Sequence, residues 1–377
     1  MNPQVCVRCV LDGNVPGTSF DSGGLCTYCR QYDPLIAQEQ YAPATRGKYL
    51  EKILRDVRQA GAGRRYDCII GLSGGVDSSY ALYVAKQQGL RPLAVHIDNG
   101  WNSELAVKNI ENLVRKLEID LETHVIDWEE FKGLQLAFLR ASVVDIELLS
   151  DHAILAGMYQ QARKHRIRHI LTGDNIATEC ALPPGWNHRK TDLRNIRAIG
   201  RAHGSVRIRT FPTLSTVSMW AHRRVLGIHN VPFLCYLPYV KTDAIAALEK
   251  DLGWRPYSGK HCESIFTRFY QGYILPTKFG IDKRSVHFSR LICSGQMTKD
   301  EAIAELKRSP YDPEMLKLDR EFVIKKLGLS ESEFEAIMSA PIKPHDAYAT
   351  DERLVRTLLD ARRRSRNLFG RLRQLAA

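Results

Sequence analysis

The sequence has no long hydrophobic run and no sign of a targeting segment. Although 44% of its 377 residues are hydrophobic, no apolar stretch approaches the roughly 18 residues that a membrane span needs. The first residues, Met-Asn-Pro-Gln-Val-Cys, contain neither a basic start nor the apolar stretch of a secretory signal peptide. These absences argue against a membrane-spanning or secreted protein and predict a cytoplasmic one.

Acidic residues are in short supply relative to basic ones. Lys and Arg number 54 and Asp and Glu 42, which gives a formal net charge of +12. The excess lies mainly in residues 189–209 and in a C-terminal tail, where arginines recur from Arg362 to Arg373 and no acid follows Asp360. Such charge implies an anionic ligand, either nucleic acid, nucleotide phosphates or an acidic protein surface. For the tail, a solvated or partner-facing basic helix is favoured over nucleic-acid binding.

The nine cysteines, an odd number, suit a reducing compartment and a metal site better than a disulfide scaffold. Two CxxC pairs, separated by 16 residues, are formed by Cys6, Cys9, Cys26 and Cys29. This spacing is typical of a four-thiolate zinc site, and with all four positions filled the Zn²⁺ is predicted to be structural. A redox CxxC is the alternative, which two pairs in register make the weaker one.

Residues 71–79 read Gly-Leu-Ser-Gly-Gly-Val-Asp-Ser-Ser, between an apolar strand and a helix. A glycine-rich turn at a helix N-terminus gathers backbone N–H groups into a phosphate site. Its serines add hydroxyl donors, and its aspartate implies bound Mg²⁺. No Lys follows the glycines, so this is not the P-loop of G-x-x-x-x-G-K-[ST] proteins, and an ordinary Gly-Ser turn is the competing interpretation. The residues predicted to bind phosphate here are Gly71, Ser73, Gly74, Gly75, Asp77 and Ser78.

Strands and helices alternate after this loop. The predicted strands are 67–72, 92–98, 121–126 and 168–172, and the predicted helices are 78–88, 103–118 and 147–165. Apolar strands that alternate with helices predict an α/β fold with a doubly wound parallel sheet. The domains expected are 1–40, a zinc-binding module; 41–66, a connecting helix; 67–240, the ATP-binding domain; and 241–377, a mostly helical substrate or partner region.

Ligands of such sheets bind beyond the carboxyl ends of the strands. The second predicted strand ends near His96 and Asp98, and the fourth is followed by Thr-Gly-Asp-Asn. Asp174 is predicted to share Mg²⁺ with Asp77 as a catalytic group, although this tetrapeptide can equally be a turn. The further ligand-binding residues predicted at these strand ends are His96, Asp98, Gly173 and Asn175, which in the ATP-pyrophosphatase superfamily that this region resembles would contact ATP.

Lys241 precedes a later amphipathic helix, in a segment that resembles the one in the ATP-pyrophosphatase superfamily whose lysine reaches the departing phosphates. A lysine is a mobile point charge suited to that role; a solvent-exposed lysine is the alternative. Between residues 253 and 297, aromatic residues are interleaved with basic ones. This pattern suits stacking on a base or sugar, or an aromatic core with a basic rim. The substrate-binding residues predicted here are Lys260, His261, Glu263, Arg268, Lys283 and Arg284.

The S-G-G-x-D-S loop resembles the pyrophosphate loop of the ATP-pyrophosphatase (PP-loop) superfamily, whose fold is adenine nucleotide alpha hydrolase-like. That resemblance implies ATP and Mg²⁺, with cleavage between the α and β phosphates. In order along residues 5–310, the CxxC pairs, S-G-G-V-D-S-S, H-I-D-N-G-W, L-T-G-D-N-I-A-T-E, G-W-R-x-Y-x-G-K-H and S-G-Q-M are similar to the N-acetyl sugar amidotransferase family. Its members act in bacterial O-antigen and surface-polysaccharide biosynthesis.

The family resemblance implies conversion of an acetamido group on a nucleotide-activated sugar into an acetamidino group. It also implies an N-terminal zinc ribbon, and a separate glutaminase and cyclase-like subunit that supply ammonia. Residue 2 is Asn and Cys262 lacks a G-x-C-x-G turn, so the chain carries no glutaminase nucleophile of either class. Cys262 also stands where the family pattern suggests an aromatic residue, which puts in doubt how tightly this segment holds its ligand.

The main rival prediction is a PP-loop enzyme that modifies tRNA, of the thiolase or lysidine-synthetase type, which the net charge would also suit. Such enzymes usually need catalytic cysteines inside the ATP domain, whereas the cysteines beyond residue 29 are isolated in sequence. Nucleic acid is therefore the less favoured ligand. A zinc-dependent interaction module without enzymatic activity comes third, because it would not need the S-G-G-V-D-S loop.

Overall fold

The computed structural model describes residues 3–179, 182–204, 206–257, 259, 262–357 and 360. Lys260, His261 and the Arg362–Arg373 tail, all singled out from the sequence, lie outside the described residues. The elements in chain order are α1 (Thr27–Ile36), α2 (Arg46–Ala60), β1 (Cys68–Gly71), α3 (Val76–Gln87), β2 (Pro92–Asp98), α4 (Glu104–Leu117), β3 (Leu121–Val125), α5 (Trp128–Ala141), α6 (Leu148–Lys164), β4 (His169–Thr172), α7 (Leu193–His203), α8 (Thr216–Arg224), β5 (His229–Pro232), η1 (Phe233–Tyr236), α9 (Lys241–Leu252), α10 (Ile265–Phe269), η2 (Tyr270–Ile274), α11 (Leu275–Phe279), α12 (Arg284–Cys293), α13 (Lys299–Lys307), α14 (Pro313–Leu327), α15 (Glu331–Ser339) and η3 (His345–Ala347).

A five-stranded parallel sheet in the order β3-β2-β1-β4-β5 forms the centre of residues 68–232. The order reverses between β1 and β4, and in such sheets the crevice beyond these two strands is the expected ligand site. Both β1 and β4 are followed by glycine-containing segments. The predicted doubly wound parallel sheet is therefore confirmed, and its switch point lies at the S-G-G loop.

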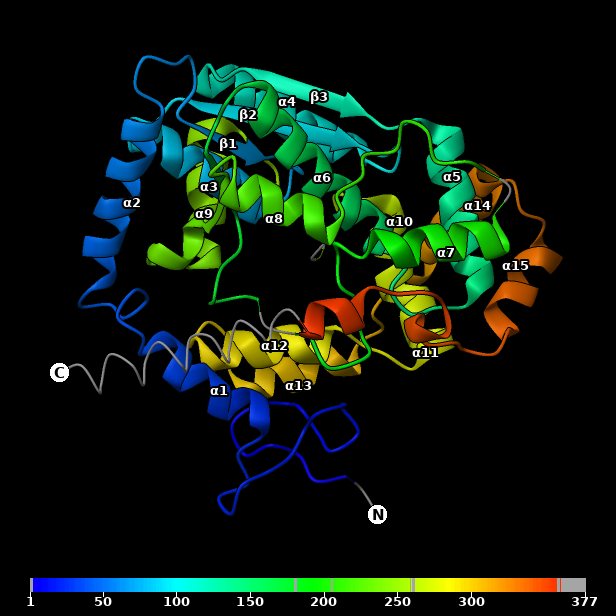
Figure 1. The fold of residues 1–377 in the computed structure, drawn as a ribbon. Helices are drawn as coiled ribbons and strands as arrows, with labels where there is room; N and C mark the ends of the chain where they lie inside the picture. The colour runs from blue at the N-terminus through cyan, green and yellow to red at the C-terminus, as the bar shows by residue number, and fades with distance from the viewer. Residues whose placement is uncertain are drawn as a thin grey trace.

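Helices cover both faces of the sheet because successive strand side chains point to opposite sides. Ile69 packs with the core that includes α5, α6 and α7, while Cys68 and Ile70 pack with α2, α3, α4 and α9. In Figure 1 the sheet lies above, and α12 and α13 form a separate layer below it, with the N-terminal loops beneath them.

Each strand and helix predicted from residue 67 to residue 172 is present within about two residues, but the prediction missed α5 and β5. β5 consists of His-Asn-Val-Pro, and its residues are exposed or only half-buried, so it has little apolar signal. Between residues 31 and 66 the chain forms the end of α1 and then α2. The described part of residues 241–357 contains helices and no strand. No helix among the described residues has both the length and the apolar character to cross a bilayer.

Candidate active site

The backbone of the S-G-G loop, residues 73–75, is fixed in a conformation that suits an anion. Gly74 has a φ of +84°, which favours glycine, and a Cβ there would come within 2.9 Å of the Ala106 carbonyl oxygen. The Gly74 carbonyl accepts hydrogen bonds from Trp254 Nε1 at 2.9 Å and from the Tyr257 hydroxyl at 3.0 Å. Two side chains far along the sequence therefore fix the backbone of the loop.

The loop leads directly into α3, whose N-cap, Gly75, makes no side-chain capping bond. The first N–H groups of a helix lack intrahelical partners, and the helix dipole favours an anion beside them. The hydroxyls of Ser73 and Ser78 lie 3.1 Å apart at this end. Backbone donors, hydroxyls and the dipole thus converge where the sequence predicted a phosphate.

The segment after β4 lies against this loop. A Cβ on Gly173 would come within 2.7 Å of the Asp77 backbone carbon and 2.9 Å of the Ser78 nitrogen, so only glycine permits this approach. The adjoining Asp174 accepts a hydrogen bond from the Thr172 hydroxyl at 2.7 Å. The two strand ends predicted to form one site are therefore in contact.

The carboxylates here fit a magnesium ion bound together with a nucleotide. Asp77 accepts a hydrogen bond from the Tyr239 hydroxyl, and the Asn175 amide lies 3.5 Å away. Burial, followed by the Asp77 charge, raises the pKa of Tyr239 well above its ordinary value, so its hydroxyl stays protonated and donates. Asp77, Asp174 and Glu179 line one cavity but do not form a closed cage of ligands. Hard oxygen donors that leave room for substrate phosphates are what Mg²⁺ requires.

Lys241 begins α9 and lines the same cavity together with Ser73 and Asp77. We call it the pyrophosphate cavity, after the ligand predicted from the sequence. The structure thus brings the three predicted catalytic residues, Asp77, Asp174 and Lys241, to one place.

His96 lines the adjoining cavity. Its Nδ1 lies 2.7 Å from the Leu72 carbonyl oxygen and its Nε2 lies 2.9 Å from the Asn102 amide. Asp98 accepts bonds from Gly100 N and Asn102 Nδ2, so it shapes the turn after β2.

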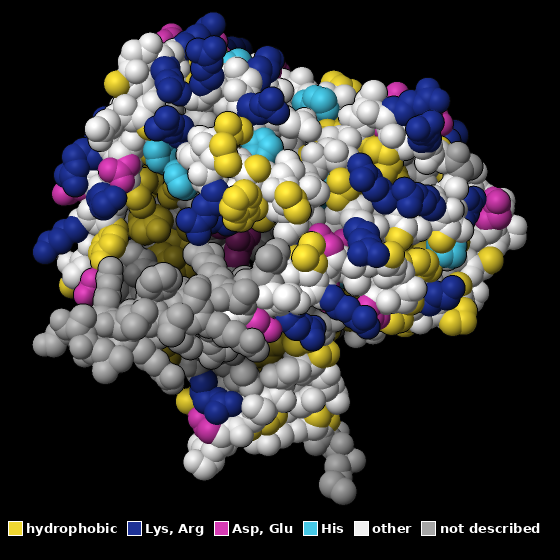
Figure 2. Space-filling view, viewed as in Figure 1, with side chains coloured by type: hydrophobic (Ala, Val, Ile, Leu, Met, Phe, Trp, Pro, Cys, Tyr) yellow, Lys and Arg dark blue, Asp and Glu magenta, His cyan; other side chains and the backbone are white. Residues whose placement is uncertain are grey.

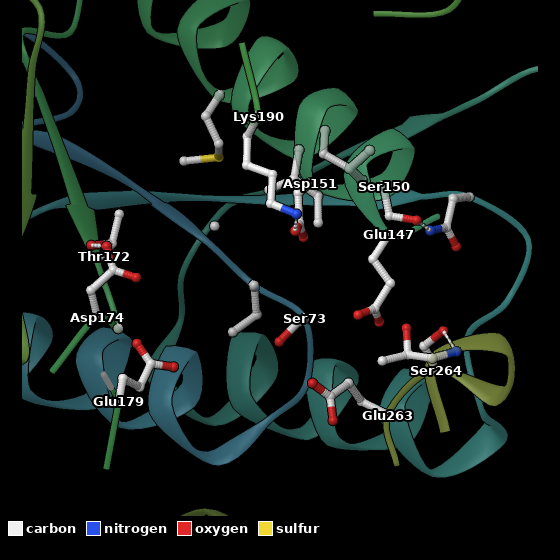
Figure 3. Close-up of a pocket in the computed structure, with 18 of the residues that line it drawn as sticks. Ser73, Glu147, Ser150, Asp151, Thr172, Asp174, Glu179, Lys190, Glu263 and Ser264 are labelled. Carbon is white, nitrogen blue, oxygen red and sulfur yellow. Dashed lines mark hydrogen bonds and ion pairs between the residues drawn. The ribbon is translucent and has the colours of Figure 1, made fainter. Parts of the chain in front are cut away.

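A larger cavity of about 730 Å³ opens from the same loop. Figure 3 shows Asp174 and Glu179 on one side of it, Glu147 and Asp151 on the other, and Ser73 between them. Figure 2 shows Lys and Arg spread over this face of the molecule, with acidic side chains deep in a hollow near its centre. The cavity has room for a nucleotide and for a second, polar substrate.

The far wall of this cavity was not predicted from the sequence. Lys190 Nζ lies 2.7 Å from Asp145 Oδ2 and 2.9 Å from Asp151 Oδ2. Burial would lower the pKa of Lys190, but the two carboxylates raise it well above its ordinary value, so the lysine stays charged. Asp151 lines the cavity from inside the molecule. Nearly half of its side chain is therefore exposed to the cavity, while the surrounding protein raises its pKa by burial. Lys190 stood out in the sequence only as part of a basic stretch.

The predicted substrate-binding residues fall into two groups. Glu263 and Lys283 line the large cavity, where Lys283 Nζ lies 3.1 Å from Glu147 Oε2. Arg268 instead pairs with Asp319 at 2.6 Å. Arg284 pairs with Asp282 at 2.7 Å and donates to carbonyls at the end of α13. Neither arginine is among the residues that line the two cavities, and these pairings give them a structural role that the sequence pattern could not distinguish from substrate binding.

The four N-terminal cysteines come together as predicted. Their sulfurs lie within 4.8 Å of one another and all four residues are buried. The Sγ atoms of Cys6 and Cys29 are 3.8 Å apart, and those of Cys9 and Cys26 are 3.6 Å apart. Tetrahedral Zn–S bonds of about 2.3 Å require sulfur separations of about 3.8 Å. Hydrogen bonds among these sulfurs lower the pKa of Cys26 and raise the pKa of Cys9 and of Cys29. This geometry can hold zinc.

Two family comparisons match different parts of the chain. Residues 67–164, from β1 to the end of α6, match the family "Queuosine biosynthesis protein QueC". Residues 263–362 match the family "LPS biosynthesis protein WbpG-like, C-terminal domain". The first match covers the pyrophosphate loop, and the second covers the segment that contributes Glu263 and Lys283 to the cavity.

Individual relatives match parts of the chain. An uncharacterized protein of Methanocaldococcus jannaschii is 36% identical over 75 residues, 20% of this chain and 26% of that protein. A probable tRNA sulfurtransferase of Geobacillus kaustophilus is 25% identical over 190 residues, 48% of this chain and 44% of that protein. The chain thus spans less than half the length of either relative.

Among solved structures, NMN synthetase from Francisella tularensis aligns with a TM-score of 0.32 and 15% identity, over 75% of this chain and 96% of that one. A likeness at this level carries no argument about fold or function. The two family matches do bear on function, because one covers the S-G-G loop and the other covers part of the wall of the large cavity. Together, the two matches support the likeness to the N-acetyl sugar amidotransferases and the PP-loop ATP pyrophosphatases that the sequence motifs indicated.

Proposed function

We propose that this protein is an ATP-dependent amidotransferase that converts the acetamido group of a nucleotide-activated sugar into an acetamidino group, with release of AMP and pyrophosphate. Its setting would be the biosynthesis of lipopolysaccharide O-antigen or a related surface glycan. The observation that carries this proposal is the wall shared by the pyrophosphate cavity and the large polar cavity, which includes Ser73, Asp174 and Glu263. One side of the polar cavity comes from the segment that matches the WbpG-like domain.

The reaction needs ATP because a neutral amide is a poor electrophile. The acetyl oxygen attacks the α-phosphorus of ATP, and the bond to pyrophosphate breaks. Ammonia then adds to the activated carbon and loses a proton, and the carbon–oxygen bond breaks with AMP as the leaving group. In this proposal, the loop N–H groups, Ser73, Ser78 and Lys241 would hold the pyrophosphate as its charge develops. Asp77 and Asp174 would hold Mg²⁺, which when bound neutralises phosphate charge.

The expected product supplies the first test. The isolated chain is incubated with ATP, ammonium and a panel of UDP- and CMP-linked N-acetyl sugars, and products are followed by mass spectrometry. We expect one sugar to exchange O for NH, with AMP as the co-product. The rate with ammonium should rise as the pH is raised above neutrality, because more free ammonia is present. Glutamine should not replace ammonium until a glutaminase and a cyclase-like partner are added. No modified sugar from any member of the panel, or glutamine hydrolysis by the chain alone, would contradict the proposal.

Asp151 should contribute to sugar binding, since its carboxylate faces the cavity and can accept hydrogen bonds from sugar hydroxyls. We expect Asp151→Asn to raise the KM for the nucleotide sugar by about 10- to 100-fold, the usual cost of losing a hydrogen bond to a charged group, and to leave the KM for ATP nearly unchanged. Asp56→Asn is the matched control, because Asp56 also pairs with a lysine, at 2.6 Å, but on exposed α2. An equal rise in both KM values would assign Asp151 to nucleotide binding or to folding instead.

The alternative is an enzyme that modifies tRNA, favoured by the partial match to a probable tRNA sulfurtransferase. A sulfur-transfer mechanism needs a reactive thiol, whereas burial raises the pKa of Cys235, which lies next to Asp174, to about 12. Binding of tRNA that weakens steeply with salt would favour this alternative. Modification of a nucleotide sugar without such binding would exclude it.

A further inference from the structure

The S-G-Q-M motif lies in the turn between α12 and α13, next to neither the glycine loop nor the strand ends in sequence. Gln296 in this turn forms two hydrogen bonds with the backbone of the segment that leads into α9. Its Oε1 accepts from Lys241 N at 3.0 Å, and its Nε2 donates to the Tyr239 carbonyl at 3.1 Å. One amide group therefore clamps both sides of Val240.

Both clamped residues are linked to the pyrophosphate cavity, because Lys241 lines it and Tyr239 binds Asp77, which also lines it. Lys241 is the first residue of α9, where the backbone N–H has no partner within the helix, and the Gln296 oxygen supplies one. Tyr239 is 5% exposed and donates its hydroxyl to the Asp77 carboxylate. Movement of this segment would therefore shift the catalytic lysine and a partner of Asp77 together.

The other side of the same turn contacts the cysteine module, residues 6–29. Arg8 Nη2 donates to the Cys293 carbonyl at the end of α12, at 3.2 Å, and Lys299 Nζ donates to the Cys6 carbonyl at 2.6 Å. The Cys293 and Cys29 sulfurs are 3.6 Å apart. The α12–α13 turn is thus held between the cysteine module and the segment from Tyr239 to Lys241.

From these contacts we propose that Gln296 is a positioning residue for Lys241 and that the cysteine module, through the α12–α13 turn, keeps it in place. The module then serves the reaction without contacting the substrate. This inference rests on the proposed function only for the catalytic role of Lys241, because the clamp itself is a structural feature that can be measured without substrate.

The clamp is tested first by hydrogen exchange in peptides that contain residues 239–244, with ATP absent. Gln296→Met keeps the size of the side chain but removes both bonds, and should speed exchange in these peptides by at least about tenfold. Gln59→Met, an exposed glutamine on α2, is the matched control. Zinc content should stay at the wild-type level in both variants. Unchanged exchange in Gln296→Met would overturn the proposal.

Hydrogen exchange in the same peptides also tests the link between the cysteine module and this segment. The variants are Lys299→Met alone and Lys299→Met combined with Arg8→Met. Faster exchange at 239–244 with zinc retained is expected, and exchange at the wild-type rate in the combined variant would overturn the proposal.

Activity then separates positioning from general damage. With the sugar accepted in the mass-spectrometric assay, Gln296→Met should lower kcat by about 10- to 100-fold, as expected from the loss of two hydrogen bonds. Combined with Lys241→Met it should lower kcat no further than Lys241→Met alone, because coupled residues are non-additive. Additive losses would overturn the proposal. A wild-type kcat in Lys241→Met would instead refute the catalytic role of Lys241, with the exchange result still standing.

Discussion

Replacement of Asp77 by asparagine is expected to abolish turnover while the protein still folds and its zinc content matches that of the wild type. Asparagine preserves the shape of the side chain and an oxygen that can accept the Tyr239 hydroxyl hydrogen bond. It removes the negative charge that we expect to bind Mg²⁺ on the departing pyrophosphate, so the rate should fall by about 10³-fold or more. The measurement is the formation of AMP and pyrophosphate with ammonium and the accepted sugar.

Asp300→Asn provides a control at an equivalent position. Asp77 and Asp300 are each the second residue of a helix, α3 and α13 respectively, but Asp300 is exposed and outside both cavities. If both variants lose activity to the same extent, the effect comes from a general change in helix capping. A wild-type rate in Asp77→Asn would reduce the loop to a structural turn, and ADP as product would refute cleavage between the α and β phosphates.

The second large effect is expected at the cysteine module. Cys26→Ser should lose zinc and most of the soluble yield, because the four cysteines are at most 1% exposed and belong to the main core. Structural zinc contributes about 10–16 kcal/mol of binding free energy in small zinc domains. The module itself has only isolated β-bridges and one helix, so it has little other structure to stabilise it.

Elemental analysis of zinc per chain, together with the thermal unfolding temperature, measures this effect. Cys293→Ser is the informative control. Its sulfur lies 3.6 Å from Cys29, yet Cys293 is outside the group of four whose sulfurs lie within 4.8 Å of one another. Zinc should therefore be retained in Cys293→Ser. Loss of zinc there would make Cys293 a ligand, and zinc retained in Cys26→Ser would refute the four-thiolate site.

The arrangement around the loop also indicates why two distant segments accompany it. Trp254 and Tyr257 bind the Gly74 carbonyl from beyond α9. Glu263 lies against the loop from the other side, since a Cβ on Gly75 would come within 3.2 Å of its Oε1. The region after α9 thus both supports the S-G-G loop and begins the wall of the large cavity, so under the proposed function binding of ATP and of the sugar is expected to be coupled.

Local sequence determined the parts of this protein that depend on short spacing. The cysteine pairs, the glycine loop, β1, β2 and the helices between them were all predictable, because each depends on neighbouring residues and on hydrophobic periodicity. The two strand ends could be assigned to one site because parallel strands deliver their carboxyl ends to the same edge.

Only the tertiary structure decided which charged residues face the cavity. Lys190 and Arg284 are both basic residues in basic stretches, yet Lys190 meets two carboxylates at the cavity wall and Arg284 caps the end of α13. Likewise Gln296 reaches Lys241 across 55 residues of sequence. Such contacts depend on how helices pack, and helix packing is determined by the whole core rather than by the residues beside each charge. The sequence therefore determines the chemistry available, and the packing decides which side chains take part in it.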